Sequence, residues 1–200
     1  MWCTPRISSC PLLFLLYINY ISDSSSKFEF FLFADDTNLL YQDKSLPLLE
    51  SVVNEELINV CDWLLANKLT LNAKKSNYVI FHPYQRKIQS LINLKVFDRE
   101  HKAFRNLERK QFVKYLGVLI DSNLSWNNHV ANVALKISKT IGIIARLRHF
   151  LPLSVLLNIY NSLIHPYLSY GLVVWGQTSK TNLEKNLAPS GKCSTLNLLL

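Results

Sequence analysis

Two adjacent acids, Asp35 and Asp36, separate two short apolar runs near the start of the chain. The runs cover residues 28–33 and 38–41, and both are rich in aromatic and aliphatic side chains that favour strands. The polar segment between them suits a tight turn, so the pattern predicts a β-hairpin with two carboxylates at its tip. Such a tip is either an ordinary solvated turn or a site that holds cations.

The composition is that of a folded, basic protein. Hydrophobic residues make up 49% of the chain and charged residues 18%, which excludes a disordered protein. Two hundred residues are enough for one or two small domains. The formal net charge of +8 favours an anionic partner, with nucleic acid first and an anionic membrane surface second.

The cysteines argue against a zinc site or a disulfide framework, because they are scattered and show no C-x-x-C spacing. They are Cys3, Cys10, Cys61 and Cys193. We expect ordinary reduced thiols in an intracellular protein, in the nucleus or the cytoplasm.

Five sequence blocks follow one another along the chain. They are Cys10–Asn19, Leu32–Thr37, Trp63–Ser76, Lys114–Asp121 and His165–Gly171, the last of which continues to Trp175-Gly176. In this order and at these spacings the blocks resemble the reverse transcriptase of non-LTR (LINE-type, jockey-like) retrotransposons. The resemblance covers about residues 10 to 177.

The resemblance implies an α+β fold. The C-terminal part of a polymerase palm, an antiparallel β-sheet with helices, would precede an all-helical thumb. The implied division gives a partial palm at residues 1–122, a thumb-like region at 123–180 and a degenerate tail at 181–200.

The resemblance also implies RNA-directed DNA synthesis by two-metal nucleotidyl transfer. Asp35 and Asp36 match the family's catalytic, metal-binding carboxylates on the palm hairpin. Mg²⁺ is the cofactor that this chemistry implies. The implied partners are an RNA template, a DNA primer and deoxynucleoside triphosphates, and no specific protein partner is expected.

Two further segments match family motifs around the substrate. Lys75 matches the palm lysine near the incoming triphosphate, and the alternative is a solvated lysine in a turn. Tyr115, Leu116 and Gly117 match the primer grip, the hairpin that holds the primer end. Gly117 either lets nucleic-acid backbone approach closely or relieves crowding in a bulge.

The segment 125–150 has a helical pattern, with apolar residues on one face. Lys136, Lys139 and Arg146 lie within about 80° of one another on the other face, at 3.6 residues per turn. In a thumb they would follow the phosphates of the template–primer, and the alternative is a solvated helix face. His129 matches a family histidine at the start of the thumb, and we expect a role in packing or capping and not in catalysis.

Packing is likewise the role expected for three residues near the end of the last block, which carry no predicted chemistry. They are Tyr170, Gly171 and Trp175.

Other elements follow from local patterns. Residues 11–21 predict a helix buried in a core. The alternative is a secretory signal. The apolar run is too short to span a bilayer. An amphipathic helix begins at a Ser45 cap and ends near residues 67–72. Strands are expected at 78–81 and 115–120, and a second helix of the C-terminal half at 153–164.

The chain also departs from the family pattern. The palm strand that carries the third carboxylate is not found, residues 4–11 replace the Gly-Val-Pro-Gln-Gly loop without its glycines, and Tyr20 replaces an acid. Losing one metal-bridging carboxylate costs on the order of a thousandfold in rate, so we expect the isolated chain to be inactive. Two alternatives remain: a non-catalytic, basic nucleic-acid-binding remnant, and a small secreted or membrane-associated protein.

Overall fold

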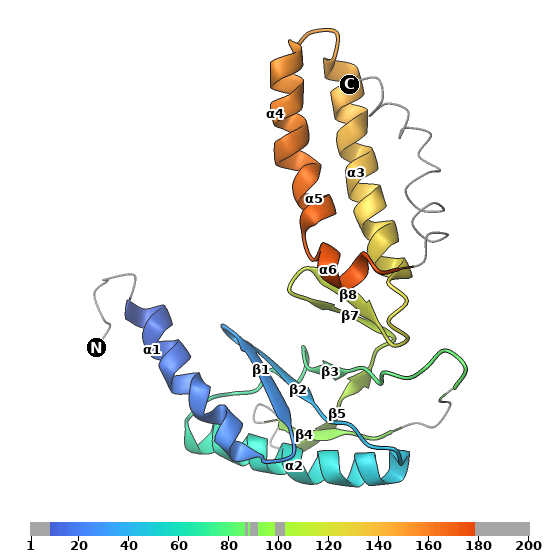
Figure 1. The fold of residues 1–200 in the computed structure, drawn as a ribbon. Coiled ribbons are helices and arrows are strands. Elements are labelled where there is room, and N and C mark those ends of the chain that lie inside the picture. The colour runs from blue at the N-terminus through green and yellow to red at the C-terminus, as the bar shows by residue number, and fades with distance from the viewer. Residues whose placement is uncertain (1–8, 87, 89–91, 99–102, 179–200) are drawn as a thin grey trace. The chain divides into compact units, whose positions relative to one another are not determined.

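The computed structural model describes residues 9–86, 88, 92–98 and 103–178 (Figure 1). The chain forms two compact units, one from residues 1–78 and 89–109 and the other from 79–88 and 110–200. Both units contain helices and short strands, in agreement with the predicted α+β class. The predicted division near residue 122 stays a prediction. The tail at 181–200, the loop residues 4–8, Cys3 and Cys193 lie outside the described residues.

The first unit combines one long and one shorter α-helix with short paired strands. Its elements are α1 (Ser9–Ile18), the 3-10 helix η1 (Asn19–Ser24), β1 (Glu29–Phe33), β2 (Asp36–Leu40), α2 (Leu46–Ala66), β3 (Asn77–Tyr78), β4 (Lys95–Asp98), β5 (Ala103–Asn106) and β6 (Glu108–Arg109).

The strands of the described residues pair only in twos. In the first unit β1 and β2 are antiparallel, as the predicted hairpin requires, β4 and β5 are also antiparallel, and β3 and β6 are parallel. A parallel pair needs a long connection, and here residues 79–107 provide it. The expectation of one antiparallel sheet is therefore corrected to small, separate two-stranded sheets.

Helix α2 carries the core of the first unit. Its predicted apolar face is confirmed, since Val53, Leu57 and Val60 are buried, and the helix contacts β4 and η1. The N-cap is Ser45, as predicted, but the Ser45 hydroxyl makes no capping bond. Instead the Ser45 amide donates to Asp43 Oδ1 at 2.8 Å.

Helix α1 is not the buried helix that its sequence predicts. Its leucines are exposed, with Leu13 63% and Leu16 59% accessible, while Ile18 and the following Ile21 are buried. The reason is that α1 contacts η1 at its C-terminal end, and η1 in turn contacts α2. In the described part of the chain, no helix combines the length and the apolar character needed to cross a membrane.

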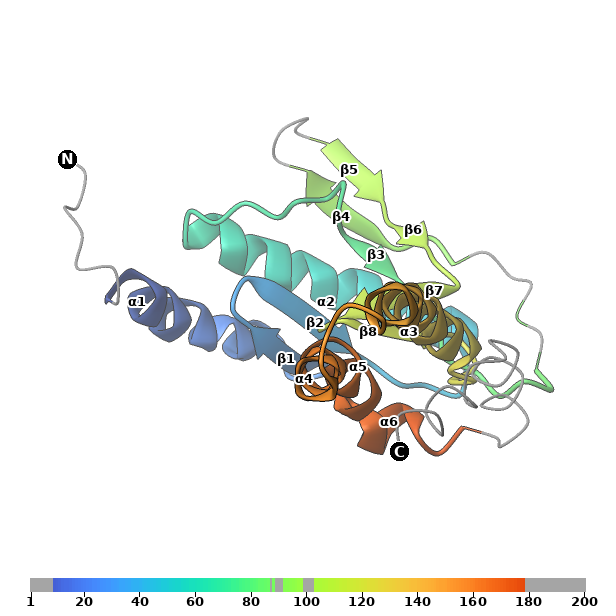
Figure 2. The ribbon, with the colours of Figure 1, turned by 90° about the horizontal axis from the view of Figure 1, so that it is seen from above.

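The second unit is a β-hairpin followed by helices. Its elements are β7 (Phe112–Tyr115), β8 (Val118–Asp121), α3 (Asn127–Leu147), α4 (Leu153–Leu163), α5 (His165–Ser169) and α6 (Leu172–Trp175). Figures 1 and 2 show α3 and α4 side by side. Val133, Ile137 and Ile144 of α3 form one core cluster with Leu156 and Ile164, which confirms the apolar face predicted for this helix.

Two strand predictions are corrected here. The predicted strand 115–120 is two strands, because Leu116 and Gly117 turn the chain with φ angles of 45° and 87°. The predicted strand 78–81 ends at Tyr78. Beyond it the chain enters the second unit, where the His82 amide donates to the carbonyl of Ser122 at 3.0 Å.

Candidate functional site

The predicted hairpin around the two acids is confirmed. Strands β1 and β2 pair with Phe33 opposite Asp36, which leaves Ala34 and Asp35 as a two-residue loop. Ala34 has a φ of 52°, the only positive φ in that loop. A positive φ at the first loop position alone is the pattern of a type II′ turn, where glycine is usual. Alanine in this region costs about 1 kcal/mol, so the tip is held in a strained conformation.

The two carboxylates stand at this tip with little protein around them. Asp35 lies in the loop and Asp36 begins β2, and both residues are exposed. Within the described part of the chain neither acid makes an ion pair. Carboxylate oxygens are the ligands that Mg²⁺ prefers, and one or two of them, with water and substrate phosphates, are its usual protein contribution. The donor set therefore fits Mg²⁺, although the described residues contain no group of three or more potential metal ligands.

A buried acid on α2 anchors the base of this hairpin. Glu56 Oε2 accepts a hydrogen bond from the Ser25 hydroxyl at 2.5 Å, and Glu56 Oε1 lies 3.2 Å from Lys27 Nζ. The hydrogen bond from Ser25 is the main reason that the pKa of Glu56 is lowered, against the opposing effect of burial. The Ser25 oxygen also accepts from the Phe28 amide at 3.3 Å. The start of β1 is thus fixed to α2.

Sequence reasoning did not single out Glu56. The available signal was its position, since residue 56 lies three residues after Val53 and four before Val60, both predicted to face the core. An acid inside an apolar stripe needs a partner, and the serine cluster before β1 supplied a candidate.

Lys75 lies in a tight turn of the same unit. Its amide donates to the Asn72 carbonyl at 3.0 Å and lies 3.2 Å from Asn72 Oδ1, while its side chain is exposed. Ala73 in this turn is buried, which fixes the turn to the unit. The geometry leaves the ammonium group accessible to an anion, and its assignment to the triphosphate stays a prediction.

The predicted primer grip is the tip of the second hairpin. Tyr115 pairs with Val118, so Leu116 and Gly117 form a two-residue loop with positive φ at both positions, the pattern of a type I′ turn. Gly117 is therefore a turn residue and not a bulge. The hydroxyl of Tyr170 donates to the Leu116 carbonyl at 2.5 Å. Sequence reasoning missed this contact, because 54 residues separate its partners.

The packing roles predicted for His129 and Trp175 are confirmed. The Leu119 amide donates to His129 Nδ1 at 3.2 Å, and Trp175 Nε1 donates to the Tyr170 carbonyl at 2.8 Å. The two rings lie 5.6 Å apart. Burial, and secondarily the charge of Lys136, lowers the pKa of His129, so the imidazole is neutral at neutral pH.

The predicted basic residues lie exposed on α3, outside its core face. They are Lys136, Lys139 and Arg146. Lys136 also stands over the ring of Tyr167, with Nζ 5.1 Å from the ring centroid. This cation–π contact orients one of the three charges and leaves it accessible. Their role as phosphate contacts stays a prediction.

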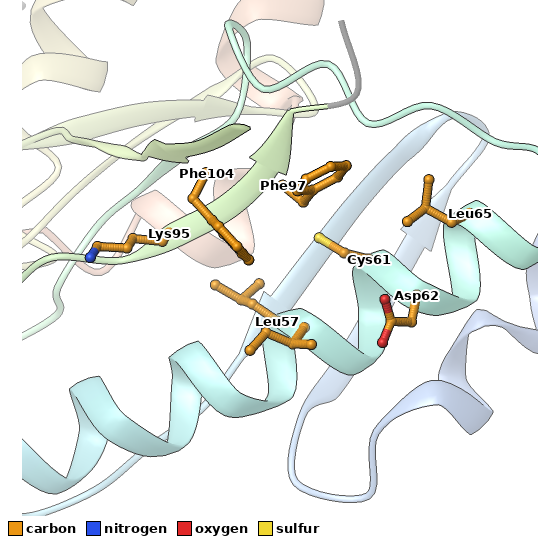
Figure 3. Close-up of a pocket in the computed structure, with 8 residues that line it drawn as sticks. Leu57, Cys61, Asp62, Leu65, Lys95, Phe97 and Phe104 are labelled. Carbon is orange, nitrogen blue, oxygen red and sulfur yellow. The ribbon is translucent and has the colours of Figure 1, made fainter. Parts of the chain in front are cut away.

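A small pocket of about 220 Å³ lies between α2 and the β4–β5 hairpin (Figure 3). Its lining is mainly apolar, with Leu57, Phe97 and Phe104, and it includes the free thiol of Cys61. Burial raises the pKa of this thiol, so it stays protonated at neutral pH and is a poor nucleophile. None of the predicted site residues lines this pocket.

Comparisons with known proteins agree with the sequence blocks. The chain is 30% identical over 157 residues to the RNA-directed DNA polymerase from mobile element jockey of Drosophila melanogaster, a match that covers 76% of this chain. It is 25% identical over 194 residues, 93% of its length, to the probable RNA-directed DNA polymerase from transposon X-element of the same species. The jockey polymerase of Drosophila funebris matches with 25% identity over 158 residues.

These matches cover a small part of each relative. The chain spans 16% of the Drosophila melanogaster jockey polymerase and 20% of the X-element polymerase. No family model matches the chain, and no solved structure matches it significantly. The family is therefore identified from the curated relatives.

Proposed function

Because the chain is a partial reverse transcriptase of the non-LTR, jockey-like family, we propose that it supplies the carboxylate hairpin of an RNA-directed DNA polymerase active site. Asp35 and Asp36 are the proposed metal ligands, and Mg²⁺ is the proposed cofactor. One observation carries the proposal. Two exposed acids occupy the tip of a tight hairpin in a chain whose relatives are named RNA-directed DNA polymerases.

The two acids act by holding negative oxygen atoms in one place before substrate arrives. The two-residue loop limits the motion of Asp35 relative to Asp36, and the Glu56 contacts hold the base of the strands. Asp35 and Asp36 would hold the metal, which would supply the charge needed to activate a primer 3′-hydroxyl and to neutralise the departing pyrophosphate.

The remaining assignments concern the substrates. In the proposed palm, residues 1–122, Lys75 balances charge on a deoxynucleoside triphosphate, and Tyr115–Gly117 contact the primer end. In the proposed thumb-like region, residues 123–180, Lys136, Lys139 and Arg146 follow the phosphates of the RNA template and DNA primer. We propose that this occurs inside the cell, in the nucleus or cytoplasm.

Metal binding tests the central assignment. Mn²⁺ is titrated into the 200-residue protein, and paramagnetic broadening of backbone NMR signals is followed. We expect broadening centred on residues 33–38 and its loss in Asp35→Asn and Asp36→Asn, because each change removes one anionic ligand. Asp23→Asn, which alters an exposed acid of η1, is the matched control and keeps the broadening.

Broadening that is weak everywhere, or that survives both hairpin changes, would remove the metal assignment. A primer annealed to an RNA template provides a second readout with Mg²⁺ and deoxynucleoside triphosphates. Extension that depends on Asp35 would overturn the expectation that the isolated chain is inactive.

A second candidate function is binding of nucleic acid without catalysis. The observation that favours it is the exposed basic side of α3, which belongs to the unit that does not contain the two acids. Two results together would select this function. The protein would bind primer–template equally with and without Mg²⁺, and Mn²⁺ would not broaden the NMR signals of residues 33–38.

A further inference from the structure

We propose that Tyr170 is a positioning residue for the Leu116–Gly117 turn, through its hydroxyl group. The proposal rests on the function assigned to that turn above, contact with the primer end. It concerns how the turn is held in place, for which the sequence blocks provide no assignment.

The turn needs external support because its backbone is strained. Leu116 has a φ of 45°, in the left-handed region that costs a residue with a Cβ about 1–2 kcal/mol. Type I′ turns ordinarily place asparagine or aspartate at this position, since these residues tolerate positive φ. With leucine at the first loop position, only Gly117 at the second position favours the observed tip.

Tyr170 supplies a contact on this backbone. Its hydroxyl donates to the Leu116 carbonyl at 2.5 Å, and its ring lies against Gly117, where a Cβ would stand 3.5 Å from Tyr170 Cε1. The next residue, Gly171, approaches the first residue of β8 closely, because a Cβ there would stand 3.4 Å from Val118 Cγ2. The Tyr170 side chain is 56% accessible, so it contacts the turn and contributes little to the buried core.

Trp175, a buried residue of the same unit, holds the backbone of Tyr170 in place. The buried Trp175 donates from Nε1 to the Tyr170 carbonyl at 2.8 Å, and its ring lies 5.6 Å from that of His129. His129 in turn accepts from the Leu119 amide of β8 at 3.2 Å. The contacts form a closed chain from the turn through Tyr170, Trp175 and His129 back to the same hairpin, entirely inside the second unit.

The consequence is that one hydroxyl sets where the turn points. A displacement of about 1 Å at a substrate-contacting group can cost 100-fold in rate, so a small loss of order at this turn matters for a primer end. Tyr170→Phe removes the hydroxyl alone and keeps the ring against Gly117. Tyr84→Phe is the matched control, because Tyr84 is 83% accessible in the same unit.

Amide hydrogen exchange tests the positioning directly and without nucleic acid. We expect Tyr170→Phe to speed exchange in the β7–β8 hairpin about three- to tenfold, the effect of losing one hydrogen bond, while the core amides of α3 keep their rates. Trp175→Phe, which removes the bond that fixes Tyr170, should act in the same direction. Unchanged hairpin exchange in Tyr170→Phe, or equal acceleration in Tyr84→Phe, would overturn the proposal.

A primer carrying 2-aminopurine at its 3′ end, annealed to an RNA template, tests the assigned role of the turn. We expect Tyr170→Phe to change the fluorescence of the terminal base with less than a twofold change in duplex affinity. A third outcome is also possible: Tyr170→Phe speeds hairpin exchange, the duplex binds, and the fluorescence does not change. This result would support Tyr170 as a positioning residue and overturn primer contact by the turn. The two failures are therefore distinguishable.

Discussion

Among single residues, His129 has the most unusual environment. It is 3% accessible, its Nδ1 accepts the Leu119 amide, and its Nε2 has no hydrogen-bond partner in the described residues. Acceptance at Nδ1 places the proton on Nε2 in the neutral ring. The sequence suggested packing or capping for His129 but could not identify the bond to Leu119, since that depends on how the β8 hairpin meets α3.

This environment predicts a pH dependence of stability. The pKa of His129 is lowered below 6.5 by burial and by Lys136, so the unfolded chain binds a proton first as the pH falls. The free energy of unfolding should therefore decrease as the pH is lowered through 6.5. Urea unfolding at pH 7.5 and 5.5 measures this. His129→Asn, which keeps an acceptor oxygen but does not titrate, should lose part of that slope, and an unchanged slope would refute the assignment.

Among the elements, the two hairpins show which turns a local sequence pattern can predict and which it cannot. The hairpin at Asp35 was predictable, because apolar strands flank a polar turn. The local sequence pattern did not predict the hairpin at Leu116, because residues 115–120 have the pattern of one apolar strand. Both turns contain non-glycine residues with positive φ, Ala34 and Leu116, and neither residue type signals that conformation.

Helices show the same contrast. The apolar faces of α2 and α3 were predictable from their periodicity, because each helix buries one face. Helix α1 was wrongly predicted as buried, since composition shows that a helix is apolar but not what covers it. The contacts that fix elements to one another, such as Glu56 with Ser25, join residues far apart in sequence and give no periodic signal.

The start of α3 depends on an acid in β8. Asp121 Oδ2 accepts from the Ser125 hydroxyl at 2.8 Å and amide at 3.1 Å, and Oδ1 accepts from the Trp126 amide at 2.9 Å. Burial alone raises the pKa of Asp121, but these hydrogen bonds outweigh it and the pKa is lowered. The loop they hold includes Leu124 and Trp126, both with positive φ.

Asp121→Asn should therefore destabilise the second unit. The amide offers one acceptor oxygen and turns an N–H group toward a donor, so we expect the free energy of unfolding to fall by about 2–3 kcal/mol. Chemical denaturation at pH 7, followed by the helical circular dichroism signal, measures this. Asp62→Asn, at an exposed position of α2, should change stability by less than about 0.5 kcal/mol. Equal effects at both positions would contradict the role of Asp121.

For the whole molecule, the charge distribution leads to a binding prediction. The proposed thumb presents Lys139 and Arg146 on one exposed side of α3. Each phosphate contact contributes about 0.7–0.9 to the slope of log K against log salt. Replacing both residues by glutamine should lower that slope by about 1.5 for a primer–template duplex, as measured by fluorescence anisotropy.

Lys44→Gln with Lys68→Gln, at exposed positions of the first unit, is the control of equal charge. If binding depends only on the net charge of the protein, both pairs will lower the slope equally. A lowering confined to the α3 pair supports the proposed phosphate contacts.

The parallel pairing of β3 with β6 has a consequence for biosynthesis. Asn77 and Tyr78 leave the ribosome about thirty residues before their partners Glu108 and Arg109. During that interval the nascent chain holds an open strand, while the β1–β2 hairpin, whose two halves are neighbours, is free to close at once. The order of synthesis therefore lets the hairpin that carries Asp35 and Asp36 form early, while the β3–β6 pair of the same unit forms late.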